Sequence, residues 1–215
     1  SALAETNAAT LSHKAPAACG TITAMSTHPL TPSVLFCSQC GTQTEHIIPA
    51  DDSRLRAVCP ACGMIHYDNP KIVVGTIPVI NQQVLLCQRA IEPGSGMWTL
   101  PAGFMENGET MAQGAARETL EEACAAVELI EPVYCLVDIP HIGQIHVFFR
   151  AHLTGTFQAG HETLAVRLFD FADIPWDEIA FNSVKTALKS YIADTAHGEF
   201  TTRHHTRHPR HPNMD

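Results

Sequence analysis

The amino-acid sequence predicts an α/β sandwich with a mixed sheet, preceded by a small metal-binding ribbon. Two observations support this prediction. Two Cys-x-x-Cys pairs lie between residues 37 and 62, and beyond them β-rich apolar runs alternate with two segments of helical pattern. Strands mixed with two helices are typical of a layered α/β fold. The 45% of apolar residues in a chain of 215 is enough to build a core.

The sequence divides into four parts. We predict a disordered segment over 1–32, the ribbon over 33–67, the α/β domain over 68–196 and a disordered His-rich tail over 197–215. The first segment is rich in Ala, Thr, Ser and Pro without a hydrophobic period, so it is either a plain flexible tail or the remnant of an organelle transit peptide. The last contains a basic tract broken by proline. We interpret it as a solvated tail, with binding of transition metals as the alternative.

The composition excludes several classes of protein. A net charge of −9 argues against a protein that binds nucleic acid by neutralising phosphates. The longest apolar runs, such as Ile72–Ile80, are far shorter than a bilayer span, so we expect no membrane partner. Four of the eight cysteines stand in the two pairs and no signal sequence precedes them, which favours a reducing compartment. We therefore expect a cytoplasmic protein, or one of an organelle stroma if 1–32 is a transit remnant.

The two cysteine pairs predict a structural zinc site. Cys37 and Cys40 are separated from Cys59 and Cys62 by eighteen residues, a spacing typical of four-cysteine zinc ribbons. Four thiolates close the coordination sphere and leave no position for a reacting water. A module this short buries little core, so zinc would supply most of its folding free energy.

Glycines and β-rich segments complete the predicted ribbon. Gly41 and Gly63 directly follow the two pairs and supply the permissive backbone that each turn needs. The segments 45–49 and 54–58 predict a two-stranded ribbon. His66 is an alternative metal ligand, but we expect it to pack on the start of the following strand.

The α/β domain begins with a predicted hairpin. Ile72–Ile80 and Val84–Arg89 are β-rich runs joined by a polar turn at Asn81. A short strand follows around Trp98–Leu100. Three further strand-like runs are expected at Val133–Asp138, Gln144–Leu153 and Ala165–Phe171.

Two helices are predicted between and after these strands. The first spans Thr110–Cys124, with Thr110 and Gln113 at the spacing of a capping box. The second runs from about Asn182 to Ala193, after Pro175.

The first helix carries the motif that points to chemistry. Gly103, Glu109, Arg117-Glu118 and Glu121-Glu122 fit the pattern G-x5-E-x7-R-E-x2-E-E. On a helix the last three glutamates share one sector, and we expect Ala112, Ala116, Leu120 and Ala123 to form the packing side roughly opposite. Clustered like charges destabilise a helix, so the cluster predicts a compensating cation, for which Mg²⁺ (or Mn²⁺) is the natural candidate. A solvated glutamate face is the alternative, and the glycine loop and register of Glu109 argue against it.

Residues Gly103–Ala125 resemble the Nudix box, and the span 36–194 resembles the Nudix hydrolases that carry a zinc ribbon, which include plant chloroplast FAD pyrophosphatases and bacterial relatives. The resemblance implies an α/β/α sandwich in which Glu118 and Glu122 are the principal Mg²⁺ ligands, with Glu121 and the Ala102 carbonyl as additional ligands. It also implies a homodimer and an ion pair that joins Glu109 to Arg117 and braces the loop. The sequence departs from the family pattern at Cys124, where glycine is usual, and at Thr119 and Ala125, where bulkier aliphatics are usual.

The resemblance further implies hydrolysis of a nucleotide pyrophosphate bond with release of AMP. Glu162 is our candidate for the catalytic base, with a surface loop acid as the alternative. Zinc-ribbon Nudix enzymes that are specific for NADH resemble one another in a stretch downstream of the box, and the segment 137–144 does not match it. This difference favours FAD or ADP-ribose as substrate over NADH. Trp98, Phe104 or Tyr134 could stack on the substrate ring, although each is also a plausible core residue. A ligand sensor without catalysis is the other alternative, and the complete set of carboxylates argues against it.

Overall fold

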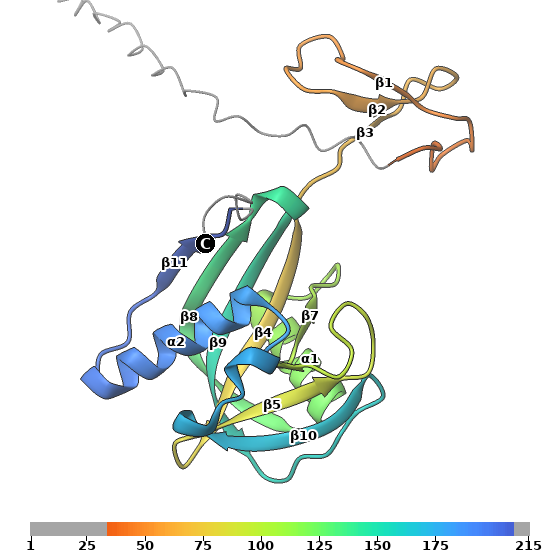
Figure 1. Cartoon of the computed structure of the whole chain (residues 1–215). Helices are drawn as coiled ribbons and strands as arrows, with labels where there is room; N and C mark the ends of the chain where they lie inside the picture. Colours follow the sequence, from red (N-terminus) through yellow and green to blue (C-terminus); the bar gives the residue numbers. More distant parts are fainter. Residues whose placement is uncertain (1–33, 209–215) are drawn as a thin grey trace, which may run out of the picture.

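The computed structural model describes residues 34–208 (Figure 1). The segment 1–32, for which we predicted disorder, lies outside the described residues, as do residues 209–215. Within the described part of the chain, no helix is long and apolar enough to cross a membrane.

The ribbon forms a small antiparallel sheet of three strands in the order β1-β2-β3. Strand β1 spans Glu45–Ile47, β2 spans Arg56–Val58 and β3 spans Ile65–His66. The sequence predicted the first two strands. The third places His66 beside Ala57 in the sheet, away from the cysteine cluster.

The α/β domain is built on one mixed sheet whose main path runs β10-β5-β4-β9-β8-β11. At its centre β4 and β9 pair in parallel, and the other main neighbours are antiparallel except for β8 and β11. The short strands β6 and β7 pair with β5 and β4. The strands are β4 (Lys71–Ile80), β5 (Gln83–Arg89), β6 (Trp98–Thr99), β7 (Ala102–Phe104), β8 (Ala126–Ile139), β9 (Gln144–Thr154), β10 (Thr163–Asp170) and β11 (Arg203–Thr206).

Two helices cover opposite faces of this sheet and make the predicted sandwich. Alternation along β9 directs Val147 and Phe149 toward α1 (Met111–Ala123), while Phe148 lies in the cluster that contains the buried side chains of α2 (Asn182–His197). Figure 1 shows α2 crossing one face of the sheet. Three single-turn 3₁₀ helices complete the fold, at Pro140–Ile142, Phe171–Asp173 and Trp176–Glu178.

Helix α1 begins as predicted, and its packing side matches the prediction in part, because Ala123 is buried and Ala112 packs against a core cluster. Thr110 is its N-cap and forms the full capping box with Gln113. However, Leu120, which we placed on the packing side, is 57% exposed, whereas Ala115, Thr119 and Glu118 are buried. The buried side of the helix is shifted from the predicted one toward Thr119. The Thr119 hydroxyl donates to the Ala115 carbonyl and shares a buried hydrogen bond of 2.7 Å with Thr76 on β4. The glutamate face therefore lies at the edge of the packing side rather than opposite it.

The expectation of a disordered tail over 197–215 is wrong for residues 203–206. These residues form β11, which adds to the sheet in parallel with β8, with Arg203 opposite Cys135 and Thr206 opposite Asp138. The physical reason is that β8 would otherwise leave an unpaired edge, and an extended chain satisfies its backbone groups. Proline begins to interrupt the tract only at Pro209, beyond the strand.

Candidate active site and metal centre

The four ribbon cysteines meet at one point. Among residues 34–208, Cys37, Cys40, Cys59 and Cys62 are the only group of three or more His, Cys, Asp or Glu side chains whose ligand atoms all lie within 4.8 Å of one another. The Sγ atoms of Cys40 and Cys59 are 3.5 Å apart, and those of Cys37 and Cys62 are 3.7 Å apart. Thiolates gathered so closely repel one another unless a cation lies between them, so the cluster is a zinc-binding group.

Each cysteine pair lies on a tight turn closed by a glycine. The Gly41 amide donates to the Cys37 carbonyl and the Gly63 amide to the Cys59 carbonyl, both at 2.9 Å. Both glycines have φ near +73°, a region that other residues rarely adopt. The predicted role of these glycines is confirmed.

In the α/β domain, Arg117 organises the loop before α1. Its guanidinium donates two hydrogen bonds to the Glu109 carboxylate, of 3.0 and 2.9 Å, which confirms the predicted ion pair. It also donates to the Phe104 carbonyl. Hydrogen bonds from Arg117 and from the Glu106 amide lower the pKa of Glu109 to about 2. The loop is therefore held by a permanently charged pair.

Arg117 also contacts two of the predicted metal ligands. Its Nη1 donates to Glu118 at 2.7 Å and to Glu121 at 3.0 Å. One guanidinium thus faces three carboxylates, and a net negative charge is left over. The carboxylates of Glu118, Glu121 and Glu122 are not gathered as closely as the four thiolates.

Glu122 is the acid that Arg117 does not neutralise. It accepts a hydrogen bond of 3.2 Å from the Ala102 amide. Burial raises its pKa to about 7, and the charges of Glu118 and Glu162 act in the same direction. Burial also raises the pKa of Glu118, against the effect of Arg117. A cation beside these two carboxylates would reverse both effects, and their hard oxygens suit Mg²⁺.

Glycines let the backbone approach these acids. A side chain at Gly103 would collide with the carboxylate of Glu118, and one at Gly114 would collide with Glu109 and Val74. At both positions a larger residue would displace a carboxylate from its present place.

The loop between β9 and β10 brings Glu162 to the same place. The amides of Gln158 and Gly160 donate to the carbonyls of Ala123 and Glu122 at the end of α1. Any side chain at Gly160 would collide with the Glu121 carbonyl. Glu162 is thereby held at the rim of the cavity that contains Glu122, with its side chain exposed.

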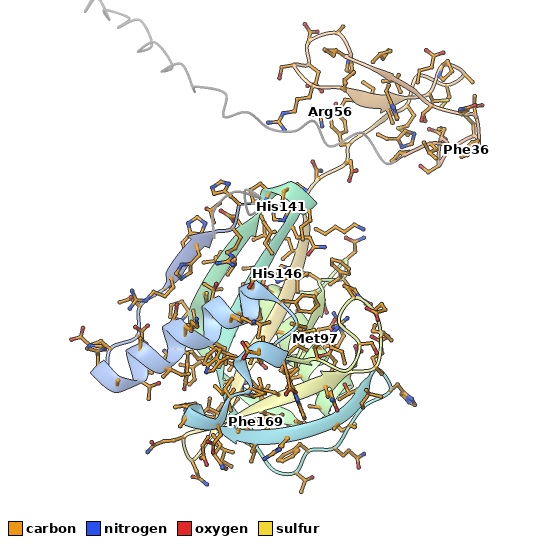
Figure 2. All side chains as sticks on the ribbon, viewed as in Figure 1. Phe36, Arg56, Met97, His141, His146 and Phe169 are labelled. Atoms are coloured by element: carbon orange, nitrogen blue, oxygen red, sulfur yellow. The ribbon has the colours of Figure 1, made fainter. Side chains whose placement is uncertain are left out.

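These groups line a cavity of about 1030 Å³. The start of β9 and the start of α2 also line it, and the motif indicated neither segment. There the His146 ring is buried between the Ser183 hydroxyl, which donates to Nδ1 at 2.9 Å, and Gln144, which accepts from Nε2 at 3.0 Å. Figure 2 labels His146 on β9 and His141 at the turn between β8 and β9. Burial lowers the pKa of His146 to about 4, so the ring is neutral near pH 7.

The three aromatic candidates have different outcomes. Trp98 is a core residue in edge contact with Phe169, and Tyr134 is buried with its hydroxyl donating to Asp194. Phe104 is 51% exposed and lines the cavity. Of the predicted stacking platforms, only Phe104 is therefore available to a ligand, and Phe181, which the sequence did not single out, also lines the cavity.

Family models match both parts of the chain. The model described as NUDIX domain matches residues 69–188, and the zinc-ribbon model described as Nudix N-terminal matches residues 35–68. The first match alone covers more than half of the 215 residues. The chain therefore belongs to the Nudix hydrolase family and carries the family's zinc ribbon before its Nudix domain.

Individual relatives agree with this assignment. The chain is similar to a NUDIX hydrolase from Nitrosomonas europaea of known crystal structure, with 50% identity, a TM-score of 0.78 and coverage of 81% of this chain and 99% of the other. It is 30% identical over 130 residues to the ADP-ribose pyrophosphatase of Methanocaldococcus jannaschii, covering 59% of this chain and 75% of that protein. It is also 38% identical over 95 residues to the NAD-capped RNA hydrolase NudC of Vibrio vulnificus, covering 43% of this chain but only 34% of NudC. The chain thus spans about a third of the length of this NudC.

Proposed function

We propose that this chain is a Mg²⁺-dependent pyrophosphatase of nucleoside diphosphates linked to another moiety, of which ADP-ribose is an example, and that it releases AMP from them. The observation that carries the proposal is the composition of the cavity. Its walls combine the carboxylates with apolar, aromatic and imidazole side chains. A volume of about 1030 Å³ suits a nucleotide of this size, with its pyrophosphate beside the acids and its base or sugar against the apolar and aromatic side chains.

The residues have distinct roles in this proposal. Glu118, Glu121, Glu122 and the Ala102 carbonyl would hold the metal, whose chemistry is to neutralise phosphate charge and to lower the pKa of a bound water. Glu162, at the rim of the same cavity, accepts the proton of the attacking water. The water oxygen forms a bond to one phosphorus, the bond from that phosphorus to the bridging oxygen breaks, and each product keeps one phosphate.

The order of the candidate substrates follows from the relatives and from the sequence. The similarity to an ADP-ribose pyrophosphatase supports ADP-ribose. FAD remains a prediction from the sequence resemblance alone. NADH and NAD-capped RNA are the second candidates, because of the similarity to NudC.

The test is chromatographic detection of AMP after incubation with Mg²⁺ and ADP-ribose, FAD or NADH in parallel. Glu122→Gln removes one charge from the metal site while keeping the size of the side chain, and we expect it to lower kcat by about 100-fold or more, because metal stabilisation of the transition state is worth several kcal/mol. Glu128→Gln, an exposed change on β8 outside the cavity, should leave turnover unchanged. Absence of AMP from all three substrates, or equal turnover in the two variants, would contradict the proposal.

A further inference from the structure

The segment 203–208 is fixed on the α/β domain and forms part of the cavity wall. Besides the pairing of β11 with β8, Arg203 forms an ion pair with the buried Asp194, which also accepts from the Tyr134 hydroxyl. His204 contacts Asp138, and the Arg207 amide donates to the Asp138 carbonyl at 2.8 Å. The backbone at residue 207 therefore has a definite position next to the sheet edge.

Arg207 lies between two cavities. It lines the large cavity described above, together with Asn182 of α2. The same two residues line a neighbouring cavity of about 370 Å³, whose other walls are Lys185, Thr186 and Lys189. The two cavities therefore adjoin at Arg207 and Asn182.

The smaller cavity is basic in an acidic protein. Three of its five lining residues are cations and none is an acid, although the whole chain has a net charge of −9. Among residues 34–208, none of the ion pairs involves Lys185, Lys189 or Arg207. The Lys189 ammonium lies 5.5 Å from the Trp176 ring centroid, which holds its stem at the cavity. Three cations that line one cavity and form no ion pair with a carboxylate are suited to a group with more than one negative charge.

We propose that this smaller cavity is a phosphate subsite that binds a phosphate on the substrate ribose, in addition to the scissile pyrophosphate. This inference rests on the proposed function, because the large cavity must hold the rest of the nucleotide. The Arg207 guanidinium, Lys185 and Lys189 bind the phosphate oxygens, and Thr186 and Asn182 provide polar walls. The phosphate can be a monoester on a small dinucleotide or the first phosphodiester of an RNA 5′ end. The chemistry that the subsite recognises is the same in both.

Calorimetric binding to the full chain tests the subsite without requiring turnover. AMP is compared with adenosine 2′,5′-bisphosphate, adenosine 3′,5′-bisphosphate and the dinucleotide pApA. We expect the added phosphate to tighten binding about tenfold, as a charge-assisted contact does. Tightening by a bisphosphate alone identifies the small-nucleotide source, and tightening by pApA alone identifies a polynucleotide end. Either result supports the subsite.

Two independent variants locate the effect. Arg207→Ala acts on the C-terminal segment, whereas the double variant Lys185→Ala/Lys189→Ala acts on α2 and leaves β11 in place. Both should abolish the tightening. Arg54→Ala, an exposed arginine on the ribbon, controls for loss of a positive charge and should retain it. Equal binding of AMP and all phosphorylated forms, or tightening that survives in both variants, overturns the inference. Tightening in wild type without hydrolysis of any dinucleotide would support the subsite while contradicting the proposed function.

Discussion

The ribbon and the α/β domain are stabilised in different ways. The three clusters of buried hydrophobic side chains all lie in the α/β domain. In the ribbon, the buried apolar residues are Ala57 and two of the metal-binding cysteines. The ribbon instead leaves seven large hydrophobic side chains exposed: Leu35, Phe36, Ile47, Ile48, Leu55, Met64 and Tyr67. Burial thus holds the catalytic domain together, and metal binding must do so in the ribbon.

The largest effect is expected when the metal cluster is broken. Cys59→Ser removes one buried thiolate, and structural zinc typically contributes about 10–16 kcal/mol to such modules. We expect zinc content to fall from about one per chain to well below that value. The ribbon should then become sensitive to protease, while the α/β domain remains resistant because its core does not depend on the cluster.

Zinc analysis by mass spectrometry and limited proteolysis measure these outcomes. Cys124→Ser, a cysteine outside the cluster, is the matched control and should keep both zinc and protection. A ribbon that resists protease without zinc would show that its few buried contacts are sufficient. Unfolding of both parts together would show that they are not independent.

A smaller effect is expected from pH in the α/β domain, where burial keeps His146 neutral. Its folded pKa of about 4 lies below the unfolded value of about 6.5, so the unfolded chain binds a proton first as pH falls. Above about pH 6.5 the ring is neutral in both the folded and the unfolded chain, so it does not change the free energy of unfolding there. Between pH 6.5 and 4 the free energy of unfolding should decline by roughly 3 kcal/mol.

Urea denaturation at several pH values, in wild type and His146→Asn, measures this decline. The variant is expected to be less stable at every pH, but its stability should fall less steeply between pH 6.5 and 4. Other titrating groups, including the zinc ligands, contribute equally to both chains and cancel in the comparison. Parallel curves would contradict a buried neutral His146.

The smallest effect concerns a single backbone position at the end of α1. Cys124 has φ 45° and ψ 35°, the left-handed conformation that glycine adopts most easily at a helix end. Cys124→Gly should raise the free energy of unfolding by about 0.5–1 kcal/mol, since relief of strain exceeds the added entropy of the unfolded chain. Urea denaturation against Cys124→Ala, which keeps a Cβ, measures it. Lower stability of the glycine variant would mean that packing of the cysteine side chain outweighs the strain.

The sequence determined the features that depend on local spacing. Two Cys-x-x-Cys pairs predicted the cluster, because each knuckle is a single turn whose geometry is set by neighbouring residues. The capping box at Thr110 was also predictable, since the start of a helix fixes the spacing of its capping residues. The ion pair between Arg117 and Glu109 was implied by the resemblance to the Nudix box.

Only the tertiary structure decided which neighbours these elements have. The packing side of α1 depends on the hydrogen bond between Thr119 and Thr76, two residues 43 positions apart. Strand β11 depends on a free edge of β8, and without it Arg207 would not reach the cavity. In the large cavity, the wall where His146 contacts Ser183 is formed by residues 37 positions apart in the sequence. Sequence periodicity describes one element at a time, whereas these contacts depend on which faces of several elements remain to be covered once the sheet has formed.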